Sequence, residues 1–146
     1  MVKPALMVLC TGNSCRSQMA EAFLRAAAGD RFDVYSAGSE PAAEVHPLAV
    51  RVMAEIGLDL AGHRPKGMQE LLGRVPVDYL FIVCDGAAKS CPSVWPGALE
   101  RFVWPFDDPA RAEGTEEERL VVFRRVRDEI GARFGAWIDE RAGVAG

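Results

Sequence analysis

The beginning of the chain restricts its possible folds more than any other segment. Residues 5–10 (ALMVLC) form a continuous apolar run of strand length, and residues 17–28 (SQMAEAFLRAAA) carry apolar side chains at helical spacing on good helix formers. A strand that is apolar on both faces is typical of a parallel sheet covered by helices. The sequence therefore predicts a strand, a tight turn and a helix at the start of an α/β domain.

The remaining sequence repeats this alternation. Further strands are predicted over residues 33–37, 78–84 and 101–104, and further helices over residues 47–56, 68–72 and 116–141. Thr115 followed by Glu118 is a capping-box pattern at the start of the last helix, whose apolar and aromatic side chains are interpreted as core. The alternation predicts a three-layer αβα sandwich, with a four-stranded parallel sheet and helices on both faces. With 146 residues, we expect one catalytic domain, residues 1–146.

Charge and hydropathy argue against several function classes. The net charge of −4 is spread as mixed signs with no long basic block, which argues against nucleic-acid binding. The longest apolar runs are far shorter than the roughly 20 residues of a membrane span, and the N-terminus lacks the apolar region of a signal peptide. We expect a cytoplasmic, monomeric protein with no membrane partner.

The chain has four cysteines, at positions 10, 15, 84 and 91. Their spacing does not match the paired ligands of a structural zinc site, and neither His46 nor His63 lies near one of them, so no metal is expected. Cys10 and Cys84 each end a predicted strand. If these strands share a parallel sheet, both thiols emerge at the same edge, where ligands bind in such folds.

The turn after Cys10 has the composition of an oxyanion-binding loop. Gly12 and Asn13 readily accept positive φ, so backbone N–H groups can point inward, and the following helix adds its positive dipole end. The planar guanidinium of Arg16 can hold two oxygens of a tetrahedral anion. The residues expected to surround the anion are Thr11, Gly12, Asn13, Ser14, Cys15 and Arg16. The side chain of Cys15 is interpreted as packing.

This electropositive turn also suggests how Cys10 reacts. The pKa of its thiol is expected to fall from about 8.5 into the range of roughly 3.5 to 7.5, which would make it a thiolate at neutral pH. Ser17 is expected to donate a hydrogen bond to it. A nucleophilic cysteine is the resulting prediction.

Residues 10–17 (CTGNSCRS) resemble the phosphate-binding loop of the low-molecular-weight protein tyrosine phosphatase fold, and more closely its thioredoxin-coupled arsenate reductase branch. The segments that carry the resemblance further are SAG at 36–38, VHPLAVRVMAEIGLDLAGH, VDYLFIVCDGAAKSCP, WPFDDPA and, near the end, FRRVRDEI. The resemblance therefore extends over almost the whole chain. The resemblance implies an enzyme that converts arsenate to arsenite, with thioredoxin as the reductant and no tightly bound cofactor.

The resemblance also assigns roles to residues. It implies that Cys10 attacks arsenate held by Arg16 and that Cys84 and Cys91 complete a thiol–disulfide relay, because cysteines oxidised to a disulfide supply the two electrons that As(V) needs. Residue type alone supports a second explanation of Cys84 and Cys91 equally well, in which one is a core residue and the other has no role in the reaction. Asp108, which precedes Pro109, is expected to be the acid, with Asp107 as the alternative.

Two other functions stay open on the sequence. The loop binds phosphate as well as arsenate, so a phosphatase of the same fold with a Cys10 phosphocysteine intermediate is the main alternative. The segment DDPARAEG lacks the tyrosines with which phosphatases of this fold flank an aromatic substrate. A non-enzymatic redox sensor or anion-binding protein is the third hypothesis.

Potassium is the ligand that the resemblance suggests, and Lys66 argues against it. Some thioredoxin-coupled members bind it near the anion loop, at residues that match Asn13, Glu21 and Ser36 and at an acidic side chain in a later loop. This chain has Lys66 in that later loop, and its ammonium would satisfy the same acceptors. We therefore expect little dependence on potassium.

Overall fold

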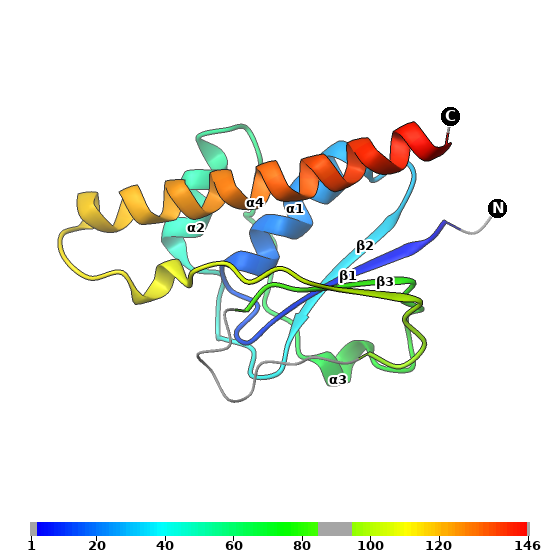
Figure 1. Ribbon diagram of the computed structural model, residues 1–146. Coiled ribbons are helices and arrows are strands. Elements are labelled where there is room, and N and C mark those ends of the chain that lie inside the picture. The colour runs from blue at the N-terminus through cyan, green and yellow to red at the C-terminus, as the bar shows by residue number, and fades with distance from the viewer. Residues whose placement is uncertain (1–2, 85–94, 146) are drawn as a thin grey trace.

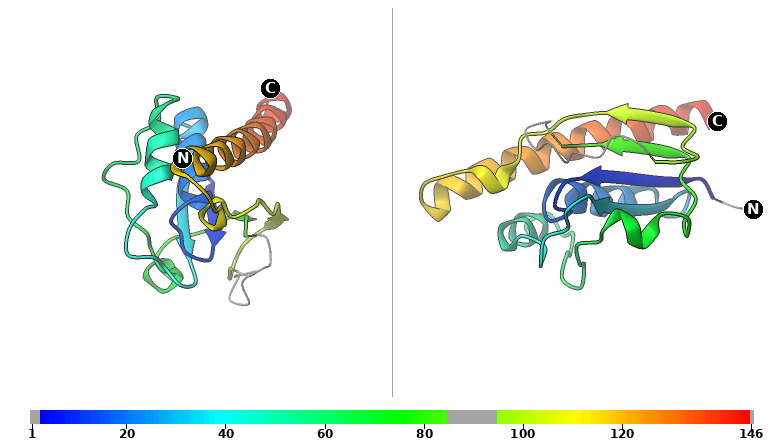
Figure 2. Two further views of the ribbon diagram at one scale, coloured as in Figure 1. Left: turned by 90° about the vertical axis from the view of Figure 1, so that its left-hand side faces the viewer. Right: turned by 90° about the horizontal axis from the view of Figure 1, so that it is seen from below.

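The computed structural model describes residues 3–84 and 95–145 and shows one parallel sheet flanked by helices (Figure 1). The elements are β1 (Ala5–Cys10), α1 (Arg16–Ala28), β2 (Asp33–Gly38), α2 (Pro47–Ala54), α3 (Met68–Leu71), β3 (Tyr79–Ile82), β4 (Glu100–Val103), the 3₁₀ helix η1 (Pro109–Arg111) and α4 (Glu116–Ala145). The four strands are all parallel, in the order β2-β1-β3-β4. Helices α1 and α4 cover one face and the short α3 lies on the other (Figures 1 and 2). The predicted αβα architecture is confirmed.

Most predicted boundaries lie within two residues of the observed ones. β3 ends at Ile82, so Cys84 lies beyond the strand rather than at its end. α4 continues to Ala145 because no proline interrupts it. Its capping box is formed as predicted: the backbone N–H groups of Thr115 and Glu118 each donate to the other residue's side chain, at 3.1 Å.

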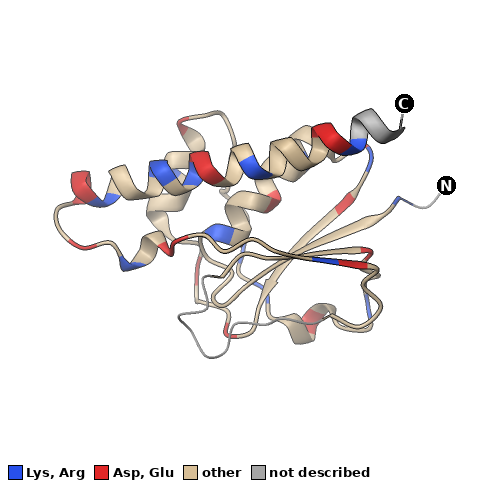
Figure 3. Cartoon of the chain, viewed as in Figure 1, with Lys and Arg blue, Asp and Glu red and all other residues tan. Residues whose placement is uncertain are grey.

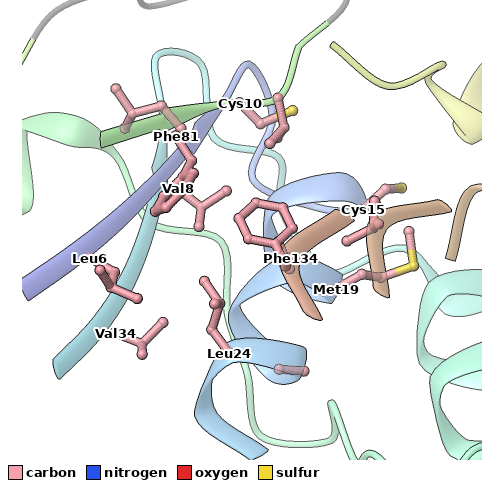
Figure 4. Close-up of a cluster of buried hydrophobic side chains, with 14 of the residues drawn as sticks. Leu6, Val8, Cys10, Cys15, Met19, Leu24, Val34, Phe81 and Phe134 are labelled. Carbon is pink, nitrogen blue, oxygen red and sulfur yellow. The ribbon is translucent and has the colours of Figure 1, made fainter. Parts of the chain in front are cut away.

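The core lies between the sheet and the layer of α1 and α4. All six residues of β1 are buried, as expected for a central parallel strand. Figure 4 shows Leu6 and Val8 of β1 in one apolar cluster with Leu24 of α1 and Phe134 of α4. The ring of Phe81 on β3 lies 5.1 Å from that of Phe134. The interpretation of the aromatic face of the last helix as packing is therefore confirmed.

The outer surface of α4 carries charged residues of both signs along its length (Figure 3). Across residues 3–84 and 95–145, no helix combines the length and the apolarity needed to cross a bilayer.

The strand order decides where a ligand can bind. β1 has β2 on one side and β3 on the other, so the chain changes its direction of winding at β1. In open parallel sheets this switch point leaves a crevice beyond the carboxyl ends of the strands. The loop that follows Cys10 lies at this point.

Candidate active site

A small pocket opens where β1 runs into α1. It has a volume of about 230 Å³ and is lined by residues 10–16, Asp108, Ala110 and Arg111. All six residues expected to surround an oxyanion lie in this lining. A water molecule occupies roughly 30 Å³ of liquid, so the pocket has room for one tetrahedral anion.

Asn13 holds the loop in its shape. Its φ of 51° is in the left-handed region, which asparagine tolerates better than most residues. Its fully buried side-chain amide donates to Ser17 Oγ at 2.7 Å and to Ser36 Oγ at 2.9 Å. Its Oδ1 accepts from the backbone N–H of Lys66 at 2.8 Å and from Gln18 Nε2 at 3.0 Å. The amide therefore ties the loop to α1, β2 and the segment before α3.

Gly38 is the second element that shapes the loop. A Cβ at this position would lie 2.3 Å from the carbonyl oxygen of Thr11 and 3.0 Å from the backbone nitrogen of Asn13. Any side chain would force the loop away from the end of β2. The anion loop can pack this closely only because residue 38 is glycine.

Arg16 connects the pocket floor to the segment that carries the acid. Its side chain is almost fully buried; Nη1 donates to the carbonyl oxygen of Phe106 at 3.0 Å, and Nη2 lies 3.6 Å from Asp108 Oδ2. An arginine is needed here because its planar fork can hold this segment and face the pocket at once. Arg16, the candidate anion-binding cation, thus also contacts the segment of Asp108, the candidate acid.

The two candidate acids lie in different places. Asp108 lines the pocket, and its Oδ1 accepts from the backbone N–H of Ala110 at 3.1 Å, which caps η1. Asp107 is exposed, and its carboxylate pairs with Arg125 at 3.0 Å. This geometry favours Asp108 over Asp107 as the acid.

Cys10 lines the pocket, and the residue is 3% exposed. Burial raises its pKa above the ordinary value of 9.0. The Arg16 charge and the backbone N–H groups of Thr11 and Gly12 lower the pKa, but they do not outweigh burial. The expected lowered pKa is therefore wrong for the pocket without an anion, because the sequence pattern shows the favourable charges and not the loss of water.

We expect alkylation of Cys10 by iodoacetamide to accelerate with pH up to and beyond the ordinary thiol range. Only the thiolate reacts, and a raised pKa moves its formation to higher pH. Arg16→Ala should shift the profile further upward, because it removes the charge that opposes burial. The measurement is site-resolved mass spectrometry over a pH series.

Cys15 provides the internal control for this experiment. Burial raises its pKa to about 12, so it should stay unmodified where Cys10 reacts. A Cys10 profile with its midpoint below neutral pH would contradict the expectation.

Cys15 and Ser17 each form a hydrogen bond with another residue of the loop. Cys15 is buried at the start of α1 (Figure 4), and its sulfur accepts a hydrogen bond from Ser14 Oγ at 3.8 Å. The hydroxyl oxygen of Ser17 accepts from Asn13 rather than serving Cys10. Within the described part of the chain, the expected Ser17–Cys10 hydrogen bond is not formed, because Ser17 belongs to the network that shapes the loop.

The sheet register brings the segment around Cys84 to the anion loop. Leu9 pairs with Ile82, and the backbone N–H of Val83 donates to the carbonyl oxygen of Leu9 at 3.0 Å. Cys10 therefore ends β1 and Cys84 follows the neighbouring β3, at the same edge of the sheet. Cys84 is buried and disulfide-bonded. Cys91, the third expected redox cysteine, lies outside the described residues.

Lys66 lies at the expected cation position. Its Nζ is 3.6 Å from Glu21 Oε1 and donates to the carbonyl oxygen of Arg64 at 3.2 Å. The same Glu21 oxygen accepts from Ser36 Oγ at 2.5 Å, and Ser36 is bonded to Asn13. Glu21, the one matched residue with a carboxylate, thus already faces a positive charge, which does not fit a bound potassium ion. The described residues contain no cluster of three or more His, Cys, Asp or Glu side chains that could hold a metal.

Three residues that hold the site were not singled out from the sequence. Gln18 donates to Asn13 and to the carbonyl oxygen of Arg64, Gly38 allows the close approach of the loop, and Phe106 supplies the carbonyl that orients Arg16. The position of Gly38 directly after a predicted strand was a usable signal. The other two act through long-range contacts that no local pattern reveals.

A parallel αβα sandwich that places a cysteine, an arginine and an aspartate around one loop has the groups of an oxyanion-binding enzyme. Residues 5–142 match the family model described as low molecular weight phosphotyrosine protein phosphatase. The chain belongs to this family.

Individual relatives have a more specific name. The arsenate reductase of Halalkalibacterium halodurans is 52% identical over 135 residues, which cover 92% of this chain and 94% of the relative. A solved structure described as an arsenate reductase in the phosphate binding state has a TM-score of 0.78 at 29% identity, covering 94% and 98% of the two chains. The thioredoxin-dependent arsenate reductase of Corynebacterium glutamicum has a TM-score of 0.65 at 28% identity, covering 92% of this chain and 61% of that one.

Proposed function

We propose that this chain is an arsenate reductase that passes electrons from thioredoxin to arsenate through Cys10, Cys84 and Cys91. The observation that carries the proposal is the 52% identity to an arsenate reductase across nearly the full length of both chains. The pocket formed by Cys10, Arg16 and Asp108 supports the same activity, because arsenate is a tetrahedral oxyanion.

The first step forms a covalent adduct. Because burial favours the neutral Cys10 thiol, its proton passes to the carboxylate of Asp108, which lines the same pocket, and the sulfur attacks arsenic. A sulfur–arsenic bond forms while an arsenic–oxygen bond breaks. Asp108 then gives this proton to the departing hydroxyl, which leaves as water. Arg16 and the loop N–H groups hold the remaining oxygens.

The second step moves the electrons. The Cys84 thiolate attacks the sulfur of Cys10, so that a disulfide forms and the sulfur–arsenic bond breaks with its electron pair left on arsenic. Arsenic(V) becomes arsenic(III) and leaves as arsenite. Cys91 then attacks Cys84, which releases Cys10 and leaves a Cys84–Cys91 disulfide for thioredoxin to reduce. The relay needs no tightly bound cofactor. We expect a cytoplasmic monomer, since the reaction involves one chain at a time and a reducing partner.

Phosphatase activity is the second candidate. Cys10, Arg16 and Asp108 would also transfer a phosphoryl group, so slow hydrolysis of aryl phosphates is expected. The pocket wall beside Asp108 is formed by Ala110 and Arg111, which offer no aromatic surface for a phosphotyrosine ring.

The test is a steady-state assay of NADPH oxidation in the presence of arsenate, thioredoxin and thioredoxin reductase. We expect arsenate-dependent turnover that disappears in Cys10→Ser, with arsenite as the product. Aryl phosphate hydrolysis without arsenate turnover would establish the phosphatase instead. Disulfide formation by peroxide with neither activity would favour a redox sensor.

We expect turnover and thermal stability to be the same in potassium and in sodium chloride at equal ionic strength. Lys66 already provides the positive charge beside Glu21, so no further ion should bind and stabilise the native state. Lys66→Ala is the matched variant and should gain a response to potassium. A large potassium stimulation of the wild-type chain would contradict this prediction.

A further inference from the structure

Arg111 lies at the mouth of the active-site pocket and has no place in the reaction described above. It is the last residue of η1, lines the pocket, and its side chain is 57% exposed. Its Nε lies 3.9 Å from Asp108 Oδ2, the same oxygen that Arg16 Nη2 approaches to 3.6 Å. The carboxylate of Asp108 therefore lies between two guanidinium groups, one buried and one facing solvent.

The charges of the pocket show why a second cation matters. Among the described residues that line it, the side chains with a formal charge at neutral pH are Arg16, Asp108 and Arg111. The formal charges of Arg16 and Asp108 cancel, which leaves the loop N–H groups as the attraction for an anion in the buried part of the pocket. Arg111 makes the pocket positive and faces the solvent from which the anion arrives.

We propose that Arg111 is an anion-capturing and specificity-determining residue, which selects small, doubly charged inorganic oxyanions at the pocket mouth. Its guanidinium offsets the repulsion between the Asp108 carboxylate and an incoming dianion. This inference rests on the proposed function and specifies the class of substrate.

The test uses inorganic phosphate, which binds without being reduced. Phosphate affinity is measured by calorimetry for the wild type, Arg111→Ala, Arg111→Lys and Arg51→Ala at low and high ionic strength. Arg51 is the matched control: it is half-exposed, pairs with Glu116 at 3.4 Å and does not line the pocket, and its loss changes the net charge equally.

We expect Arg111→Ala to weaken phosphate binding about threefold to fivefold at low ionic strength, with a smaller difference at high salt. Arg111→Lys should keep most of the affinity, and Arg51→Ala should bind like the wild type. With arsenate as substrate, Arg111→Ala should raise KM by a larger factor than it changes kcat.

Unchanged phosphate affinity in Arg111→Ala would overturn the inference, and so would an equal loss in Arg51→Ala, which would show an effect of net charge alone. Failure of the proposed function gives a different result. The wild type would then bind phosphate with the expected dependence on Arg111 but would not reduce arsenate. This result would support the role of Arg111 in anion capture and would refute the reductase activity.

Discussion

Cys84→Ser is expected to abolish arsenate-dependent turnover while leaving the slow hydrolysis of an aryl phosphate intact. The serine hydroxyl cannot attack the Cys10 sulfur to form a disulfide, so the sulfur–arsenic bond has no route to break with its electrons on arsenic. The phosphatase reaction uses Cys10, Arg16 and Asp108 and does not involve residue 84. Both activities are measured on the same preparation, arsenate reduction by NADPH oxidation and hydrolysis by phenolate release.

The retained hydrolysis is the control for folding. Cys84 is buried, and serine leaves a small polar group in its place, so a variant that loses both activities has lost the pocket rather than the relay. In that event Cys84→Ala repeats the experiment without the buried hydroxyl. Sustained arsenate turnover in either variant would refute the relay.

Asp108→Asn is expected to lower kcat/KM for arsenate by about 10² to 10⁴, the usual contribution of a general acid. Asparagine has nearly the same shape and can still accept the backbone hydrogen bond of Ala110 through its oxygen, so η1 should remain formed. It cannot give a proton to the departing oxygen. The measurement is initial velocity against arsenate concentration with saturating thioredoxin.

Asp107→Asn is the matched control for this substitution. Asp107 is the neighbouring residue, but it is exposed and pairs with Arg125 away from the pocket, so its loss should leave kcat/KM almost unchanged. A larger loss from Asp107→Asn than from Asp108→Asn would reverse the assignment of the acid.

The fold could be predicted because its signals are local. The apolar run of β1 and the helical spacing of α1 follow from alternation and propensity, and the capping box of α4 was visible as Thr115 and Glu118. The end of β3 could not be placed, because the apolar sequence continues to Cys84 after strand pairing stops at Ile82. An apolar sequence indicates that residues are buried, and the buried residues here continue beyond the hydrogen-bonded part of β3.

The sequence predicted which residues form the candidate site better than it predicted the pKa of Cys10. The loop sequence indicated Cys10 and Arg16 together, since both belong to one short turn. The pKa of Cys10 was predicted in the wrong direction, because its value depends on how completely the surrounding chain excludes water. The partners of Arg16 come from the segment around Phe106, ninety positions away, and only the folded chain brings them together.

The close contact between Gly38 and the anion loop limits how the loop could be used in protein engineering. Residues 10–17 look like a portable motif, but their path is set by a glycine on β2, by the Ser36 hydroxyl and by the Gln18 amide. Grafting the eight residues alone onto another strand–helix junction would transfer the chemical groups without their arrangement. A successful transplant would have to carry the end of the neighbouring strand and the segment around Lys66, so the smallest transferable unit is a strand pair with its helix and that segment.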